Sequence, residues 1–220
     1  MKTAYKLLTV AALLAASETA LASTNLILNG DFEINNAVAG QYQFNLSNAE
    51  FSALVNDVTA YGTSAELDLY TSGSGYEPNP QSGAWEVRLH GDGGGLFDAF
   101  SFRLSSPVVS GTSYNLRFYV AGDLGMNPIG PLSIKVGLSS DASSFGALLY
   151  TSNGLIGTGS WNQYDYSFIA ANDASYLTVQ NVSVSAVVDN FLLAPVPEPE
   201  TWAMLLAGLG LVGWAARQRR

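Results

Sequence analysis

The pattern of apolar and polar positions in the central part of the chain repeats every second residue. Phe100, Phe102 and Leu104 alternate with polar neighbours, and the same alternation runs over 114–120 and 132–138. Side chains of a strand point alternately to the two faces of a sheet, so this period predicts half-buried β-strands rather than amphipathic helices. Shorter runs with the same period predict further strands at 85–89, 164–168 and 177–179.

Segments rich in Gly and Asn, at 73–80, 91–95, 122–130 and 153–159, separate these strands. Short strands at such spacing are typical of a sandwich of antiparallel sheets, so the expected fold class is all-β. The chain has no cysteine, which excludes a disulfide framework and a thiolate metal site.

The first 22 residues have the pattern of a secretory signal peptide. Lys2 and Lys6 precede an apolar run at 7–16, and Ala20 and Ala22 form a small-x-small cleavage site. An amphipathic N-terminal helix is the alternative, but the run has no polar face. We therefore expect residues 1–22 to be removed on export.

A second apolar run, at 201–216, precedes three arginines at 217, 219 and 220. It predicts a single transmembrane helix at about 201–216. At ~1.5 Å per residue it reaches about 24 Å, against roughly 30 Å of hydrocarbon, so the helix is short for this purpose. The arginines are expected to stay in the cytoplasm, with the preceding chain outside.

Pro197, Glu198 and Pro199 stand directly before this run, and both prolines favour an extended conformation. The order of Pro-Glu-Pro, apolar run and terminal arginines resembles the PEP-CTERM sorting signal. That resemblance implies an exosortase, a membrane protease of Gram-negative bacteria, as a transient partner. The alternative is a plain membrane anchor that no protease cuts. The expected organisation is signal peptide 1–22, β-sandwich 23–194 and sorting signal 195–220.

The sandwich region opens with the segment 25–33 and closes with 187–193. These two segments resemble the first and last strands of galactose-binding-like jelly rolls, which include many carbohydrate-binding modules. The resemblance implies a jelly-roll topology. It also implies a structural calcium held by the Asp31 carbonyl and the Glu33 and Asp189 carboxylates, since calcium takes six to eight oxygen ligands. The alternative is that Asp31 and Asp189 are turn residues and Glu33 is solvated.

The net charge of the chain is −9. Without residues 1–22 and 195–220, four basic and fifteen acidic residues remain, a net charge of −11. Such a surface repels phosphate backbones and anionic lipids, so we exclude nucleic-acid binding and peripheral membrane docking. It favours neutral glycans or cations.

Catalytic chemistry finds little support in the sequence. The one histidine, His90, follows a predicted strand and is expected to point to solvent, and no serine lies in a Gly-x-Ser-x-Gly turn. A glycosidase needs two carboxylates across a cleft, but acidic residues are too common here to identify such a pair. We therefore expect no enzyme.

Aromatic residues are the remaining candidates for a binding site, because their rings stack on the apolar faces of sugars. Tyr76, Trp85 and Asp92 are the residues that we select for carbohydrate binding. For Trp85 the alternative is packing in the core, since it begins an alternating apolar run.

These features predict a non-catalytic protein of the cell envelope, outer surface or extracellular matrix, exported across the inner membrane of a Gram-negative bacterium. Binding of extracellular polysaccharide is its expected activity. A structural biofilm or matrix protein without a small ligand is the alternative, and a glycan-active hydrolase is a more distant one.

Overall fold

The computed structural model describes residues 24–73, 78–91, 95–122, 133–152, 160–182, 185–197 and 199–218. The predicted signal peptide therefore lies outside the described residues. Asn25–Ala194 forms one compact unit, and the C-terminal helix belongs to a second unit.

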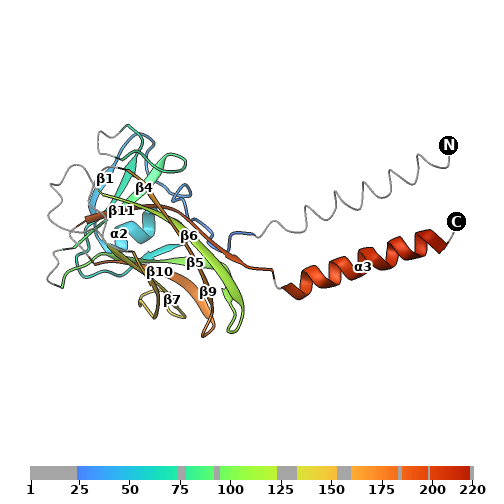
Figure 1. The fold of residues 1–220 in the computed structure, drawn as a ribbon. Helices are drawn as coiled ribbons and strands as arrows, with labels where there is room; N and C mark the ends of the chain where they lie inside the picture. Colours follow the sequence, from blue (N-terminus) through green and yellow to red (C-terminus); the bar gives the residue numbers. More distant parts are fainter. Residues whose placement is uncertain are drawn as a thin grey trace. The chain divides into compact units, whose positions relative to one another are not determined.

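The compact unit consists of two β-sheets (Figure 1). All strand pairs whose register is defined in the described residues are antiparallel. The predicted all-β jelly-roll sandwich is therefore confirmed. The six-stranded sheet contains, in spatial order, β1 (Gln43–Leu46), β3 (Leu67–Thr71), β4 (Trp85–His90), β11 (Ser185–Pro195), β6 (Ser113–Ala121) and β9 (Asn162–Ile169). The five-stranded sheet contains β2 (Val58–Ala60), β5 (Ala99–Val108), β10 (Ala174–Asn181), β7 (Ile134–Ser139) and β8 (Ala147–Thr151).

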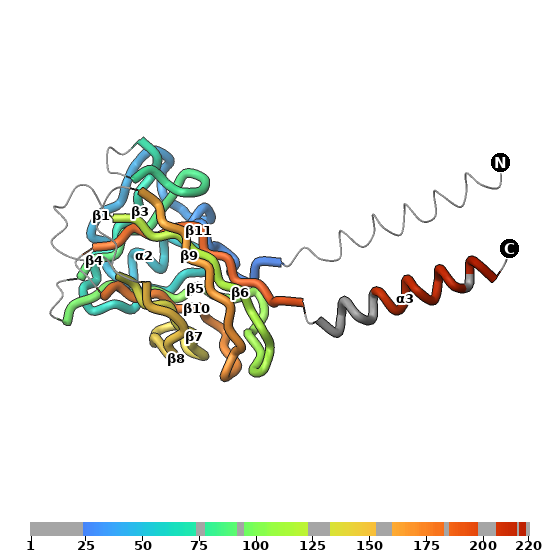
Figure 2. The backbone as a smooth tube through the Cα atoms, viewed as in Figure 1, coloured from blue at the N-terminus to red at the C-terminus, as the bar shows by residue number. Residues whose placement is uncertain are grey.

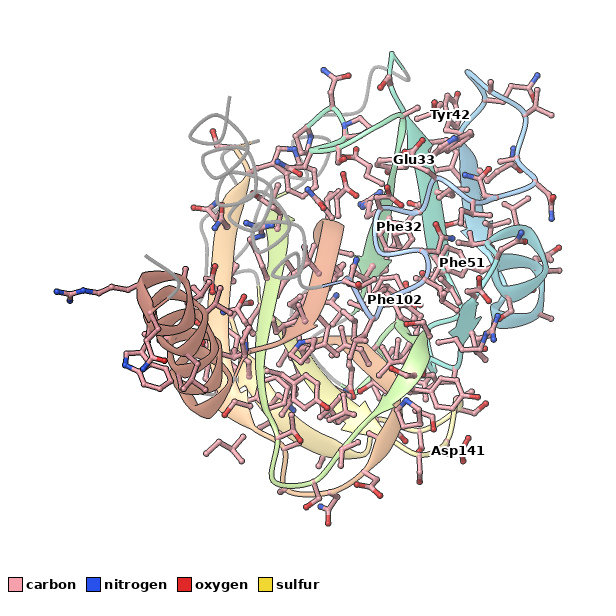
Figure 3. The ribbon with its side chains drawn as sticks, turned by 90° about the vertical axis from the view of Figure 1, so that its right-hand side faces the viewer. Phe32, Glu33, Tyr42, Phe51, Phe102 and Asp141 are labelled. Atoms are coloured by element: carbon pink, nitrogen blue, oxygen red, sulfur yellow. The ribbon has the colours of Figure 1, made fainter. Side chains whose placement is uncertain are left out.

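Aromatic rings fill the space between the sheets. Phe102 of β5 is fully buried, and its ring centroid lies 5.3 Å from that of Phe32 and 5.0 Å from that of Phe191. Phe32 also meets Phe100 edge to face at 5.7 Å. Figure 3 shows Phe32, Phe51 and Phe102 inside the molecule. Burial of such large apolar side chains is the main favourable contribution to folding.

The opening segment 25–33 was expected to be the first strand, and this is wrong for most of its length. It bonds to both sheets instead. Leu26 N–H donates to Leu193 O (2.7 Å), and Leu26 O accepts from Ser105 N–H (2.8 Å). Phe191 N–H donates to Gly30 O (2.8 Å), and a Cβ on Gly30 would lie 2.1 Å from Phe191 O. The opening and closing segments therefore lie together, although the first is not a regular strand.

A short helix, α2 (Asn48–Leu54), was not predicted. Ser47 caps the first turn, and the Glu50 carboxylate accepts in return from the Ser47 backbone N–H, which completes a capping box. Its buried Phe51 stacks on Phe100 at 6.2 Å. This contact fixes α2 against the core.

The C-terminal unit contains the helix α3 (Pro199–Gln218), so the predicted helix at 201–216 is confirmed. Pro199 is its first residue, a position where proline costs no helical hydrogen bond. The prediction that Pro199 keeps the chain extended is therefore wrong, whereas Pro197 lies outside any helix or strand. In the part of the chain that the structure describes, no helix has the length and hydropathy needed to cross a membrane, so the transmembrane assignment is not confirmed.

Candidate functional site

The strands β3 and β4 carry charged side chains on the face of the six-stranded sheet that points away from the core. Leu67 and Leu69 of β3 point into the core, which directs Asp68 outward. In β4, Val87 and Leu89 point inward and Arg88 outward. Because Asp68 and Arg88 are directly opposite in the antiparallel register, the pairing of the strands itself brings the two charges together.

Asp68 is the centre of a hydrogen-bonded network and is only 1% exposed. Its Oδ2 accepts from Arg88 Nη1 (3.2 Å) and from the Tyr70 hydroxyl (3.3 Å), and lies 2.9 Å from His90 Nε2. Its Oδ1 accepts from the Asn45 backbone N–H (2.7 Å). A buried carboxylate is tolerated only with such partners, so this network holds β1, β3 and β4 together.

Arg88 connects the network to the middle of the sheet. Its Nε donates to Ser185 Oγ of β11 (2.9 Å), and its Nη1 donates to the Tyr70 hydroxyl (2.8 Å). The guanidinium carbon also lies 6.0 Å from the centre of the Tyr70 ring. Arg88 is thus fixed by directional contacts to both neighbouring strands, β3 and β11.

His90 was expected to point to solvent, and this is wrong. Its side chain is 14% exposed and contacts Asp68. Its backbone N–H donates to Asp98 Oδ2 (2.7 Å), while Asp98 Oδ1 accepts from Glu66 N–H (3.1 Å). Burial raises the pKa of Asp98, and these backbone donors act in the opposite direction. Asp98 therefore fixes the end of β4 and with it the position of the imidazole.

Aromatic rings lie beside this network at the β1 edge of the sheet. The rings of Tyr42 and Phe44 are 4.3 Å apart, and Phe44 meets Tyr70 edge to face at 5.6 Å. Tyr42 is 41% exposed, and Figure 3 shows it at the periphery. An aromatic surface therefore adjoins polar groups that are already held in place.

The residues selected for carbohydrate binding are not brought together in the described part of the chain. Trp85 is 6% exposed and belongs to the core, so its assignment to sugar binding is wrong, because a stacking ring needs a face open to solvent. Tyr76 and Asp92 lie outside the described residues. No pattern in the sequence pointed to Tyr42 and Phe44, whereas Asp68 and Arg88 could have been noticed as charges inside apolar runs.

The residues selected for calcium do converge, on the segment before β4. Glu33 Oε1 accepts from the backbone N–H groups of Ala84 (2.7 Å) and Trp85 (2.8 Å). Asp189 Oδ2 accepts from Ser82 N–H (2.9 Å), only two residues earlier in the segment. The alternative that Glu33 is solvated is wrong for its Oε1 atom, which bonds to these two backbone N–H groups.

Asp189 is fully buried. Burial raises the pKa of this carboxyl to about 7, the Ser82 and Asn190 N–H donors lower it, and the nearby charge of Asp31 raises it further. A buried carboxylate beside a second acidic group is a donor set suited to a hard cation such as Ca²⁺. Among the described residues no group of three acidic or histidine side chains is arranged to hold a metal, so a calcium here would also need carbonyl oxygens such as that of Asp31.

The C-terminal unit has a separate role. Residues 195–220 match the PEP-CTERM protein-sorting motif. The resemblance seen in Pro197, Glu198 and Pro199 is therefore confirmed, although Glu198 itself lies outside the described residues. The PEP-CTERM motif implies an exported protein.

Solved structures similar to this chain include carbohydrate-binding modules. The CBM22-1 xylan-binding domain of Paenibacillus barcinonensis Xyn10C is 14% identical over 74% of this chain and 99% of its own, with a TM-score of 0.43. The K1 adhesin domain of Lys-gingipain from Porphyromonas gingivalis is 15% identical over 72% and 100%, with a TM-score of 0.45. The tailspike protein 4 enzymatically active domain of bacteriophage CBA120 is 12% identical over 78% of this chain and 21% of its own, with a TM-score of 0.43. No curated protein matches this chain in sequence.

Proposed function

We propose that this is an exported, non-catalytic protein of the cell envelope or extracellular matrix whose sandwich binds polysaccharide at the β1 edge of the six-stranded sheet. The observation that carries the proposal is the pair of rings of Tyr42 and Phe44, of which Tyr42 is exposed. Phe44 packs on the buried ring of Tyr70, whose hydroxyl bonds to the buried Asp68 and Arg88. Rings that are open to solvent stack on the apolar faces of pyranoses, and the buried polar network holds the strands that carry these rings in place. The net charge of −11 between residues 23 and 194 favours a neutral glycan.

Affinity gel electrophoresis in extracellular polysaccharide tests this proposal. Tyr42→Ala is expected to abolish retardation, because it removes the most exposed ring of the group. Tyr119→Ala is the matched control, since Tyr119 lies in β6 of the same sheet and bonds to Gln163 Oε1 (2.9 Å). Equal mobility of wild type, Tyr42→Ala and Tyr119→Ala at every polysaccharide concentration would refute glycan binding at this edge.

A structural matrix protein without a ligand is the second candidate. The saturation of Asp68 favours it, because both carboxylate oxygens already have partners inside the protein. In that case the network only stiffens the sheet. Loss of the Tyr42 ring would then change neither retention by polysaccharide nor any other binding property.

The second part of the proposal concerns sorting. Pro197 is exposed and lies outside regular structure, which is the form in which proteases accept a substrate. We propose an exosortase-type membrane protease as transient partner and a Gram-negative surface as destination. Mass spectrometry of the protein from its host tests this, with and without the protease gene. A mature C-terminus at Arg220 in both strains would contradict processing.

We also propose a structural calcium at the Asp31 carbonyl and the Glu33 and Asp189 carboxylates. The buried Asp189 carboxyl supports it, because its raised pKa reflects a negative charge that burial disfavours. The ion would supply the positive charge that stabilises the ionised carboxylates. Glu33 and Asp189 would then link the opening segment, the segment before β4 and β11.

A further inference from the structure

The four edge strands of the two sheets differ in how well they are protected from pairing with another chain. β1 and β8 contain register shifts, and β2 has only three residues. β9 has eight residues and pairs with β6 from Asn162 to Ile169 without a shift. Edge strands are normally blunted by shortness, bulges, lysine or proline, and β9 has none of these. Figure 2 shows β6 and β9 running side by side.

The hydrogen bonds at the end of β9 show which of its backbone groups face outward. Ala170 N–H donates to Thr112 O (3.0 Å), so the even-numbered positions of β9 direct their N–H and C=O groups to β6. The odd-numbered positions therefore direct these groups to the open edge. They are Gln163, Asp165, Ser167 and Ile169, and all four side chains are exposed.

We propose that β9 is a self-complementary edge on which a second copy of this chain pairs antiparallel, so that two six-stranded sheets become one continuous sheet. Pairing centred on Tyr166 brings Asp165 opposite the partner's Ser167 and Gln163 opposite the partner's Ile169. Each matched pair exchanges two N–H···O=C hydrogen bonds. In this register every outward backbone group of β9 has a partner.

The side chains select this register over its neighbour. Pairing centred on Asp165 would place two carboxylates directly opposite, which is unfavourable. Pairing centred on Tyr166 avoids that contact and leaves Asp165 next to Arg117, its neighbour on β6. On the other face it extends an existing row of rings, in which Tyr166 lies 6.0 Å from Phe168 and 5.1 Å from Tyr150. Tyr164 then lies opposite the partner's Phe168.

This inference does not depend on glycan binding, because β9 and β1 are at opposite edges of the sheet. It is tested by sedimentation equilibrium of residues 25–194, which contain both sheets and the whole described core. Wild type is expected to show a reversible monomer–dimer equilibrium. Ser167→Pro removes one outward N–H and no bond to β6, so it is expected to give a folded monomer.

A pair of charge variants tests the register. Ser167→Asp places a carboxylate opposite the partner's Asp165, and this occurs twice in each symmetric dimer. It is expected to weaken association roughly fivefold, whereas Ser167→Lys is expected to strengthen association by about the same factor. Asp141→Asn is the control, because it changes the net charge as Ser167→Lys does but lies in the exposed turn after β7. A wild type that stays monomeric, or a dimer that responds equally to both Ser167 variants, would overturn the proposal.

Discussion

Asp189→Asn is expected to make the stability of the protein less dependent on pH, because it removes a buried carboxyl. The side chain is fully buried and both carboxylate oxygens accept backbone N–H groups, from Ser82 at 2.9 Å and Asn190 at 2.6 Å. Burial raises its pKa from 3.8 to about 7. Asparagine has a similar shape and no charge, so the variant removes the titration and keeps most of the packing.

The sign of the effect follows from proton binding. Between pH 3.8 and about 7 the folded protein keeps a proton on Asp189 that the unfolded chain has lost. Stability is therefore greatest below the lower value and falls as pH rises through the upper one. A shift of about three pKa units corresponds to roughly 4 kcal/mol of unfolding free energy over this range. Asparagine also loses one acceptor, which costs about 1 kcal/mol at every pH.

Urea titrations at a series of pH values in EDTA measure this effect. The free energy of unfolding of wild type is expected to fall with rising pH more steeply than that of Asp189→Asn. Burial also raises the pKa of Asp98, but both proteins contain Asp98, so the difference between them isolates Asp189. Asp173→Asn serves as control, since Asp173 is exposed and its Oδ1 accepts from Ser110 N–H. Parallel pH profiles for wild type and Asp189→Asn would show that the buried carboxyl does not titrate as argued.

Two further predictions concern the ion and the core. Calcium is expected to raise the melting temperature at neutral pH, because it stabilises the ionised form of Asp189. For the same reason it is expected to make the free energy of unfolding of wild type depend less on pH. The same melting temperature in calcium and in EDTA would exclude the ion. Phe102→Ala is expected to lower the free energy of unfolding by about 3–5 kcal/mol in urea, because its fully buried ring contacts three other rings. A loss below about 1 kcal/mol would mean that the aromatic core collapses around the gap.

The period of two in the sequence located β4, β5, β6, β7, β9 and β10, because each of these strands packs one face on the core. It missed β3, β8 and β11, and also β1 and β2, which have four and three residues and are too short to define a period. It also missed α2, whose one helical signal was the pair formed by Ser47 and Glu50. The period therefore found the strands that alternate clearly, whether they lie inside a sheet or, like β9, at its edge.

The calcium residues and the glycan residues show different limits of sequence reasoning. The pairing of the opening and closing segments was foreseen, and Glu33 and Asp189 do converge. The partners that hold them, Ser82 and Ala84, belong to a segment that no local pattern connects with either end. Trp85 packs in the core with Val87 and Leu89, the alternative that its alternating apolar run had indicated.

The outward face of β3 and β4 explains why exposure could not be predicted from alternation. Asp68 and Arg88 occupy the polar positions of their strands, where an exposed face was expected, yet they are 1% and 5% exposed. Asp68 and Arg88 bond to each other, Asp68 also accepts from Asn45 of β1, and Arg88 also donates to Ser185 of β11. The outward face of the sheet therefore carries buried polar side chains, while its inward face carries apolar ones. A charge in such a place cannot rearrange to meet a ligand without loss of stability. Any glycan bound at this edge would therefore meet the Tyr42 ring first, on a polar support that is fixed beforehand.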